Sequence, residues 1–418
     1  MIEKKIISKR FDKIDPYSIA DYIATGGYKS LAKAMAGQRI NILSEVEKSR
    51  LRGRGGAGFP VAIKMMALAK EAALVKYIVC NADEGEPGNF KDRAIMEKDP
   101  HSILEGMIIT AYATRATKGY IYIRCEYDKP IEIMRHAVEE ARKNHFLGQK
   151  IDKIDFDFDI EIRLGAGSYV CGEEFALLES IEGKTGRTRV KPPFPTSVGL
   201  FGKPTEINNV ETFANIPVII GMGGDEFAKI GTKSSTGTKL LSLSGNVNNK
   251  GVYEIPFGVP IKTVIDELGG GVPDSRALKM VQLGGACGPI IPRYLLDMII
   301  DFDRFDEFES KTGSGAIIVM DDRCDIFDIL LRNVTFFKHE SCGKCAPCRE
   351  GHNQLERLLR KFVDRKATIT DLISIESLAR VMHQTSLCGL GQTSPTSIIS
   401  TLRYFRDDYI DRLESLEV

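Results

Sequence analysis

The chain has 418 residues, of which 43% are apolar and 27% are charged. This composition is ordinary for a globular protein and excludes the fibrous and disordered classes, while the length favours about two to four domains. Lys plus Arg and Asp plus Glu both number 57, so no net charge attracts nucleic acid or an anionic membrane surface. Because no apolar run reaches the roughly 18 residues that span a bilayer and no export signal is visible, we expect a cytoplasmic protein.

Strands and helices are expected to alternate through the first half of the chain. After polar helices in residues 1–50, the apolar pattern predicts a helix at 131–143 and strands at 77–80, 120–123 and 156–164. The last of these shows strict alternation, which is typical of a half-buried strand. Residues 1–237 are therefore predicted to be an α/β domain with an N-terminal helical lead-in.

The pattern changes in the second half. Short apolar runs with turn signals predict a small α+β module over residues 238–322, with a helical 263–268 and strands at 240–244, 252–255, 280–283 and 317–320. Helical periodicity then predicts a C-terminal helical bundle over residues 323–418, from segments at 326–330, 355–362, 372–382 and 398–410.

Four of the nine cysteines lie in a pattern that binds metal. Cys342, Cys345 and Cys348 have the spacing C-x2-C-x2-C, and Cys388 follows after one helical hairpin. A cubane iron-sulfur cluster needs four soft thiolates, which three clustered cysteines and one distant cysteine supply. Structural zinc more often uses two C-x2-C pairs, so the pattern favours iron-sulfur over zinc and over buried structural thiols. A redox cluster implies an electron donor and an acceptor.

A glycine-rich segment, RGRGGAGFP at 52–60, contains G-x-G-x-x-G at Gly53, Gly55 and Gly58. A Rossmann fingerprint must follow a strand, whereas this one follows the charged, helix-like residues 45–52, so we reject a standard Rossmann site. Two interpretations stay open. The glycines either let backbone N–H groups approach a phosphate or a flat ring, or form only a flexible turn.

Two further loops follow predicted strands. Residues 81–88, NADEGEPG, come at the carboxyl end of a strand, where open α/β sheets bind ligands, although composition alone favours a solvated acidic turn. Residues 165–174, GAGSYVCGEE, lie between a strand and an apolar helix, a context that suits an anion. Glu173 and Glu174 can also be favourable carboxylates of the first helical turn.

Together these segments resemble the family of flavoprotein subunits of bacterial respiratory complex I, the 51 kDa-type subunits of NADH:quinone oxidoreductase. The matching stretches occur in the family's order and cover nearly the whole chain: 52–60, 81–93, 165–174, 191–195, 208–212, 341–351 and 386–395. The resemblance implies that the α/β domain is Rossmann-like but non-standard and binds FMN and NADH. It also implies that the middle module is ubiquitin-like and that the bundle carries a 4Fe-4S cluster on Cys342, Cys345, Cys348 and Cys388.

The resemblance assigns site residues one by one. The implied FMN pocket consists of Gly53, Gly55, Gly56, Lys64, Asn81, Asp83, Glu84, Tyr169, Gly172, Glu173, Asn208, Asn209 and Thr212. NADH is expected to stack over the flavin against Phe59, Glu86, Glu174, Lys191 and Phe194. Glu84 and Glu86 are the candidate catalytic residues, Glu84 by tuning the flavin together with Asn81. The hydride step itself requires no general acid or base.

Three positions depart from the family pattern. Met65 stands where the family usually has Trp, and Ala67 replaces an aromatic residue that can help to hold the adenine. Gly85 stands where a residue with a hydroxyl group is common.

The expected function is NADH oxidation by hydride transfer to FMN, followed by single-electron transfer to the cluster and onward toward quinone. Expected partners are a thioredoxin-like 2Fe-2S subunit of the 24 kDa type and a larger iron-sulfur subunit of the peripheral arm. No nucleic acid is expected, and contact with the cytoplasmic face of the inner membrane would come only through the complex. The alternative is the diaphorase subunit of an NAD-linked hydrogenase or formate dehydrogenase. An alternative from a different functional class is a zinc-stabilised scaffold or interaction protein, which would bind neither flavin nor nicotinamide.

Overall fold

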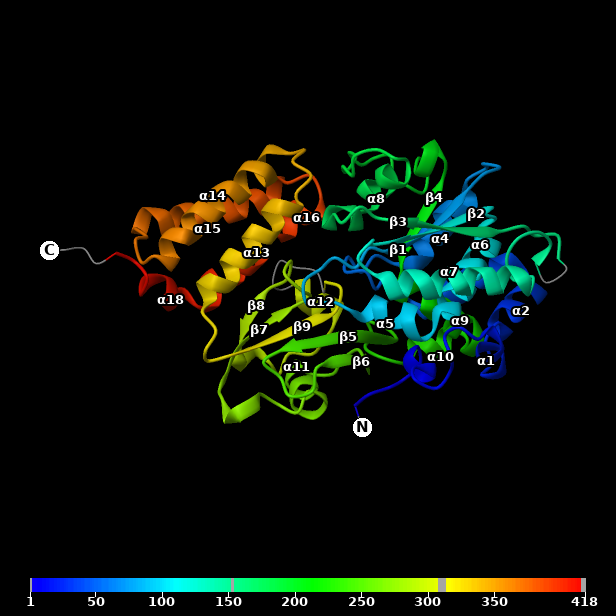
Figure 1. Cartoon of the computed structure of the whole chain (residues 1–418), viewed down its shortest axis with the longest axis horizontal. Coiled ribbons are helices and arrows are strands. Elements are labelled where there is room, and N and C mark those ends of the chain that lie inside the picture. The colour runs from blue at the N-terminus through cyan, green and yellow to red at the C-terminus, as the bar shows by residue number, and fades with distance from the viewer. Residues whose placement is uncertain (1, 152–153, 307–312, 415–418) are drawn as a thin grey trace. The chain divides into compact units, whose positions relative to one another are not determined.

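The computed structural model describes residues 2–151, 154–306 and 313–414 (Figure 1). The chain forms two compact units. The first comprises Met1–Gly85, Phe90–Leu241 and Val252–Gly258, and the second comprises Glu86–Asn89, Ser242–Gly251 and Val259–Val418. The predicted division at residues 237 and 322 uses other boundaries and stays a prediction.

The first unit is built on a parallel four-stranded sheet. Its strands are β1 (Tyr77–Ala82), β2 (Lys118–Ile123), β3 (Asp159–Leu164) and β4 (Thr205–Asn209), in the order β3-β2-β1-β4. Because all strands point the same way, the carboxyl ends of β1 and β4 lie together, with Asn81 in register with Asn209. The predicted α/β architecture is confirmed.

The helices of this unit explain how the sheet is covered. Helix α6 (Pro100–Thr114) is buried along its whole length and packs against β1, β2 and α9 (Val210–Met222). The remaining helices described in this unit are α1 (Ile19–Ala24), α2 (Lys29–Ala36), α3 (Arg39–Ser49), α4 (Val61–Lys70), α5 (Lys91–Lys98), α7 (Asp128–Lys143), α8 (Glu174–Ile181) and α10 (Gly224–Ala228). The predicted lead-in of helices is confirmed, and the glycine-rich loop follows helix α3, as the rejection of a Rossmann site required.

The strand predicted at 156–164 is wrong in its first half, because β3 begins only at Asp159. Phe158 instead exchanges two backbone hydrogen bonds with Gly148, of 2.9 and 3.0 Å. Phe156 is buried with its ring edge-to-face against Tyr112 of α6, at a centroid distance of 5.4 Å. Phe156 and Phe158 are thus buried by loop contacts, and they extended the alternation of apolar and polar residues beyond the N-terminal end of β3.

A mixed sheet is formed by residues from the middle of the chain. Its strands are β5 (Thr238–Gly245), β6 (Gly251–Pro256), β7 (Leu278–Leu283), β8 (Ile290–Pro292) and β9 (Ala316–Asp321), in the order β6-β5-β9-β7-β8. Strands β5 and β9 are parallel, whereas β7 is antiparallel to β8 and β9. The four predicted strands are confirmed and β8 was missed, since three residues show no period. Short helices α11 (Ile261–Thr263), η5 (Val264–Leu268) and α12 (Phe302–Asp306) accompany the sheet. The ubiquitin-like character stays a prediction.

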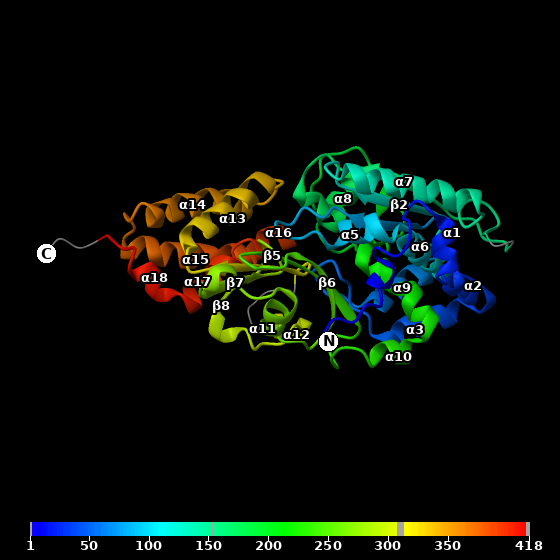
Figure 2. The same ribbon diagram turned by 60° about the horizontal axis from the view of Figure 1, so that its bottom comes forward.

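The end of the chain is helical, as predicted. Helices α13 (Ile326–Glu340), α14 (Ala346–Val363) and α15 (Ile369–Thr385) run alongside one another in Figures 1 and 2, and α13 and α15 both contact α14. Their core includes the ring of Phe327, which lies 5.3 Å from that of Phe362 and 4.9 Å from that of Tyr409. Short helices α16 (Gly389–Thr393), α17 (Thr396–Tyr404) and α18 (Arg406–Ile410) follow. Among the described residues, no helix is both long and apolar enough to cross a bilayer.

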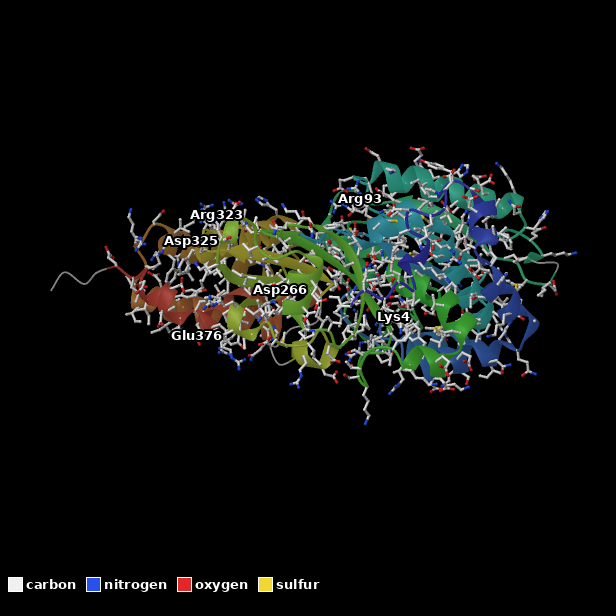
Figure 3. The ribbon with its side chains drawn as sticks, turned by 90° about the horizontal axis from the view of Figure 1, so that it is seen from below. Lys4, Arg93, Asp266, Arg323, Asp325 and Glu376 are labelled. Atoms are coloured by element: carbon white, nitrogen blue, oxygen red, sulfur yellow. The ribbon has the colours of Figure 1, made fainter. Side chains whose placement is uncertain are left out.

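The single helix predicted at 398–410 is wrong, because the chain breaks at Phe405 between α17 and α18. The break turns Tyr409 fully into the core. It also lets Arg406 pair at 3.0 Å with Glu376 of α15, which is labelled in Figure 3. Asp325, labelled in the same view, accepts the Phe327 N–H at the start of α13 and pairs with Arg412. Packing and ion pairs on both sides of the break thus outweigh one continuous helical pattern.

The N-terminal segment is fastened by one buried carboxylate. Glu254 on β6 is fully buried and accepts backbone N–H groups of Ile6, Ile7 and Ser8 at 3.0, 3.0 and 2.8 Å. It also accepts the hydroxyls of Ser8 and Thr238, both at 2.6 Å. Five donors therefore depend on one side chain.

We expect Glu254→Ala to lower the free energy of unfolding by about 3 kcal/mol, because it leaves several buried donors without an acceptor. Chemical denaturation gives the value, and hydrogen exchange of residues 6–8 should accelerate. Glu267→Ala, which removes an exposed carboxylate, is the control. Equal stability of the two variants would contradict this role for Glu254.

Candidate functional site

The glycine-rich loop is held firmly rather than being a free turn. The Gly53 N–H donates to the Phe59 carbonyl at 2.9 Å, which closes the loop, and the Arg54 N–H donates to the Thr212 hydroxyl at 2.9 Å. The Arg54 side chain is fully buried, where it donates to the carbonyls of Thr236 and Thr238 at 2.6 and 3.1 Å. The loop thus lies against the start of α9 in a fixed conformation.

Polar side chains gather where β1 and β4 end. The Asn81 amide donates to the Gly172 carbonyl at 2.8 Å, which ties β1 to the turn before α8. On β4, the side-chain oxygen of Asn208 accepts a hydrogen bond from the Lys64 ammonium of α4. The side-chain NH2 of Asn208 donates to Glu206 at 2.7 Å. The structure therefore brings Lys64, Asn81, Gly172 and Asn208 together with the glycine-rich loop at one end of the sheet.

Three glycines at this end lie close to neighbouring residues, and a Cβ would be tightly packed at two of them. A Cβ on Gly55 would lie 3.0 Å from the Cβ of Asn209, and one on Gly85 would lie 3.1 Å from the Tyr169 ring. A Cβ on Gly172 would lie 3.5 Å from the Asp83 carbonyl oxygen. Bare backbone beside amide, carboxylate and ammonium groups suits a flat, polyhydroxylated phosphate ester such as FMN. The residues present therefore fit the flavin.

A buried group of charges lies behind Asn209. The Lys91 ammonium is 2.5 Å from Asp92, 2.9 Å from Glu211 and 3.1 Å from the Asn209 amide oxygen. Glu211 also binds Lys239 at 2.5 Å, and the Asn209 amide donates to Asp92 at 2.6 Å. Although burial opposes its charge, the carboxylates raise the pKa of Lys91 above its ordinary value. Burial lowers the pKa of Lys239 to about 7 despite Glu211.

No sequence pattern indicated this group. Lys91, Asp92 and Glu211 lie in stretches that carry the family resemblance, but no spacing rule links position 91 to 211 or 239. Only the fold brings them together.

Glu84 is directed at helix α5. Its carboxylate accepts the N–H groups of Asp92 and Arg93, both at 2.9 Å, and the Tyr127 hydroxyl at 3.2 Å. Burial, followed by the charge of Asp92, raises the pKa of Glu84 to about 7. The proposed tuning of a flavin by Glu84 stays a prediction, since both carboxylate oxygens bind this helix terminus.

Glu173, Glu174 and Lys191 form one charged group at the start of α8. Glu173 is the N-cap and accepts the N–H groups of Phe175 and Ala176 at 3.0 and 2.9 Å. The Lys191 ammonium lies 3.2 Å from Glu173 and also pairs with Glu174. Burial lowers the pKa of Lys191, but the two carboxylates outweigh it and leave the pKa raised. The first-turn interpretation therefore holds for Glu174, whereas Glu173 is the N-cap residue before that turn.

Two aromatic residues, Phe59 and Phe194, are also expected to contact NADH. Phe59 and Phe194 are 49% and 57% exposed, which leaves both rings free to stack on a ligand. Met65, by contrast, is fully buried in the core, so it makes no ligand contact.

Glu86 belongs to the second unit. It is largely buried, and its carboxylate accepts the Cys287 N–H at 2.9 Å. Gly285, at φ +97°, lies against the Glu86 side chain so closely that a Cβ there would clash. The loop 284–288 thus determines where the Glu86 carboxylate points.

Three of the four clustered cysteines lie at helix starts in the second unit, and Cys342 lies in the loop between α13 and α14. Cys345 and Cys388 are the N-caps of α14 and α16, and Cys348 lies in the first turn of α14. A helix N-terminus favours a thiolate. Burial, with added effects of Cys345, Cys388 and Cys342, raises the pKa of the Cys348 thiol to about 12.

The cysteines fit a multi-iron cluster better than a single ion. Within the described ranges, no group of three or more His, Cys, Asp or Glu side chains is arranged to hold one metal ion. A cubane places each thiolate on a different iron, so its ligands need not converge on one point. The Ser386 hydroxyl is buried and has no hydrogen-bond partner among the described residues, and a Cβ on Gly391 would lie 2.6 Å from the Ser386 Cβ and 3.0 Å from the Cys348 Cβ. The thiol set and this polar atom suit a sulfide-containing cluster.

Comparison with known families agrees with both sites. Residues 46–218 match the family described as the Nuo51 FMN-binding domain, and residues 328–412 match the NADH-ubiquinone oxidoreductase-F iron-sulfur binding region. The F 2 subunit of NADH-quinone oxidoreductase of Rhizobium meliloti is 42% identical over 98% of this chain and 97% of its own length. The chain belongs to the family of flavoprotein (F) subunits of NADH oxidoreductases. Members bind FMN and a 4Fe-4S cluster and use NADH as substrate.

Relatives from another enzyme class are equally similar. The NADP-reducing hydrogenase subunit HndC of Solidesulfovibrio fructosivorans is 46% identical over 97% of this chain and 82% of its own length. A crystal structure of an NAD+-reducing [NiFe]-hydrogenase has a TM-score of 0.87 and 33% identity, covering 99% of this chain and 68% of that one. The family therefore includes subunits that work with different electron partners.

Glu206, beside Asn208, gives this site a measurable pH dependence. Burial raises its pKa to about 7, against the effects of Lys64 and Asn208, from an ordinary value of 4.5. The folded protein therefore binds this proton more tightly than the unfolded chain does. Its ionisation costs stability increasingly as pH rises from 4.5 to about 7, and the cost is constant above that.

We expect Glu206→Gln to stabilise the protein more at about pH 8 than at about pH 5, by a few kcal/mol, because the amide has no charge to bury. Denaturation in constant excess FMN at each pH measures this difference. Glu267→Gln, at an exposed position, should give the same change at both pH values. A Glu206→Gln effect that did not depend on pH would show that the carboxyl group titrates normally in the folded protein.

Proposed function

We propose that this chain oxidises NADH by hydride transfer and passes the electrons singly to its own cluster. When bound, FMN supplies a carrier that accepts two electrons together and releases them one at a time, which a nicotinamide cannot do with an iron-sulfur cluster. One observation carries the proposal: a single chain has a glycine-lined polar site on a parallel sheet and four cysteines with iron-sulfur spacing.

The roles of the flavin-site residues follow from their positions. The backbone of Gly53, Gly55 and Gly56 would approach the bound flavin, with Arg54 and Thr212 holding the loop. Polar groups from the strand ends and the turn before α8 would fix its ring and side chain: Lys64, Asn81, Asp83, Tyr169, Gly172, Asn208 and Asn209. Glu84 would act through the start of α5. None of these groups needs to move a proton in the hydride step.

The NADH contacts would come from side chains around the α8 terminus and from the acidic loop. Phe59 and Phe194 offer exposed aromatic faces for stacking. Glu174 and Lys191 would meet the ribose and phosphates, and Glu86 would lie against the nucleotide. This arrangement would orient the nicotinamide over the flavin and exclude water from the reacting face.

For the electron acceptor, we propose the peripheral arm of NADH:quinone oxidoreductase. The relatives that are F subunits of that enzyme span nearly the whole chain at similar identity, including the Aquifex aeolicus protein at 42% over 97% of this chain. The partners would be a thioredoxin-like 2Fe-2S subunit and a larger iron-sulfur subunit. The chain would then lie at the cytoplasmic face of the membrane only through that complex.

A hydrogenase diaphorase subunit is the second candidate, which is favoured by the 46% identity to a subunit of a hydrogenase. Both candidates share the NADH half-reaction, so the tagged protein must be isolated from its own cell with its partners. NADH-dependent quinone reduction by the isolated complex would support the first candidate. Hydrogen-dependent nicotinamide reduction would support the second.

Replacing Cys345 by Ser should remove the cluster's reduced-state EPR signal and electron transfer beyond the flavin, because a hydroxyl is a poor ligand for iron. NADH oxidation by ferricyanide, which can draw electrons from flavin directly, should survive in part. Cys324→Ser, at a cysteine outside the cluster motif, is the matched control. An unchanged iron content and EPR signal in Cys345→Ser would disprove the ligand assignment.

Replacing Glu174 by Ala should lower the preference for NADH over NADPH by about 1–3 kcal/mol. A carboxylate accepts hydrogen bonds from ribose hydroxyls and repels a 2′-phosphate. Removing Glu174 also deprives Lys191 of one of its two carboxylate partners, so that Lys191 can bind a phosphate. Glu174→Gln, which keeps an acceptor without the charge, should give an intermediate preference. The ratio of kcat/KM for the two nucleotides measures this. A wild-type ratio with lowered thermal stability would assign Glu174 only to the helix terminus.

A further inference from the structure

His352 lies on α14, one turn beyond Cys348, and is 1% exposed. Its Nδ1 is 3.6 Å from the Cys348 sulfur, and its Nε2 is 2.8 Å from the Ser394 hydroxyl. The Phe337 ring lies nearly parallel to the imidazole, at a centroid distance of 6.2 Å and an angle of 18°. The ring is therefore fixed by contacts on both edges and on one face. Neither the cysteine spacing nor the proposed electron path explains why a polar ring is buried here.

The two hydrogen bonds constrain where the ring proton lies. A neutral imidazole carries hydrogen on only one of its two nitrogens. A cysteine that binds iron has lost its proton and can only accept a hydrogen bond. The contact with Cys348 is then favourable only if Nδ1 carries the proton. Nε2 must accept in that case, and the Ser394 hydroxyl can turn to donate to it.

The Ser394 hydroxyl is able to make this change. In the structure it also lies 3.3 Å from the Gly391 carbonyl, to which it donates when it accepts from the histidine. Rotating the hydroxyl toward His352 gives up that longer bond for the 2.8 Å one. Ser394 thus permits the tautomer that directs the Nδ1 proton at the sulfur, because its hydroxyl can donate to Nε2.

We propose that His352 is a positioning residue that raises the reduction potential of the 4Fe-4S cluster by donating from Nδ1 to the Cys348 sulfur. This inference rests on the proposed ligation by Cys348. A donor at a ligand sulfur stabilises the more negative, reduced cluster relative to the oxidised one. Ser341, whose hydroxyl is 3.2 Å from the same sulfur, is the other side chain in hydrogen-bonding range of Cys348 among the described contacts.

Three substitutions of His352 distinguish the loss of the N–H donor to sulfur from the loss of packing in the core. His352→Asn places an amide N–H near the Nδ1 position, so it can keep the bond to sulfur. His352→Gln reaches instead toward the Nε2 position and can keep only the bond to Ser394. His352→Leu removes both bonds and keeps an apolar side chain in the core. His383→Leu is the matched control, because His383 of α15 binds the Gln392 carbonyl in the same region at 2.8 Å but no cysteine.

The measurement is the midpoint potential of the cluster in the purified holoprotein, from EPR-monitored redox titration at constant pH. We expect His352→Gln and His352→Leu to lower this midpoint potential. At a fixed potential the ratio of oxidised to reduced cluster should then rise about three- to tenfold, and a tenfold change corresponds to about 59 mV for one electron. His352→Asn and His383→Leu should stay near the wild-type value.

Iron content and the intensity of the EPR signal are recorded for every variant, so that the ligand assignment is tested apart from the role of His352. A wild-type protein without a cluster signal would refute the proposed function. Wild-type potentials in His352→Gln and His352→Leu at full iron content would overturn the inference. An equal fall in all three His352 variants would also overturn it, since the effect would then come from packing. If His352→Leu fails to assemble, the Asn and Gln pair still decides.

Discussion

The buried ammonium of Lys91 is the interaction on which the flavin end of the first unit depends. It lies between Asp92 of the same helix and Glu211 of α9, out of contact with solvent. An uncompensated charge there would cost several kcal/mol, so each carboxylate fixes the place of its partner. Asn209 is bound to both Lys91 and Asp92, and it also caps α9. The last residue of β4, the start of α5 and the start of α9 are thus held as one rigid assembly. Gly55 can approach Asn209 closely because it has no Cβ, which would lie 3.0 Å from the Asn209 Cβ.

What the sequence predicted depends on how local each signal is. The strands β1 and β2, helix α7 and the helices α13 to α15 follow from short-range periodicity, which local packing satisfies. The strand before Asp159 was predicted too long because Phe156 and Phe158 are buried by loop contacts that mimic alternation. Helix α17 was predicted to continue through Phe405, because the local sequence pattern gives no sign of the ion pair between Arg406 and the distant Glu376. Nor could spacing find the ion group of Lys91, Glu211 and Lys239, whose members are brought together only by long-range folding.

The two sites illustrate the same difference. The cysteine motif was visible because three ligands share one loop and the fourth begins the next short helix, so that spacing and geometry agree. The residues proposed to contact FMN and NADH are scattered over five segments and were predicted only through family resemblance. Even there, the structure changes the emphasis. Glu84 and Glu173 both accept hydrogen bonds from backbone N–H groups at helix N-termini. They therefore stabilise the starts of α5 and α8 and are also candidates for ligand contact.

The residues that bind flavin and nicotinamide carry no information about the final electron acceptor. Hydride transfer requires only that the two rings are stacked and the charges of the nucleotide are met, and this requirement is the same whether the partner subunits reduce quinone or oxidise hydrogen. The cluster is different, because its potential decides how readily electrons leave the flavin. A chain in this family can therefore keep its NADH site unchanged and adapt to a new partner through the side chains around Cys348. His352 and Ser394 lie where such adaptation would act, since they change the energy of the reduced cluster without touching either substrate.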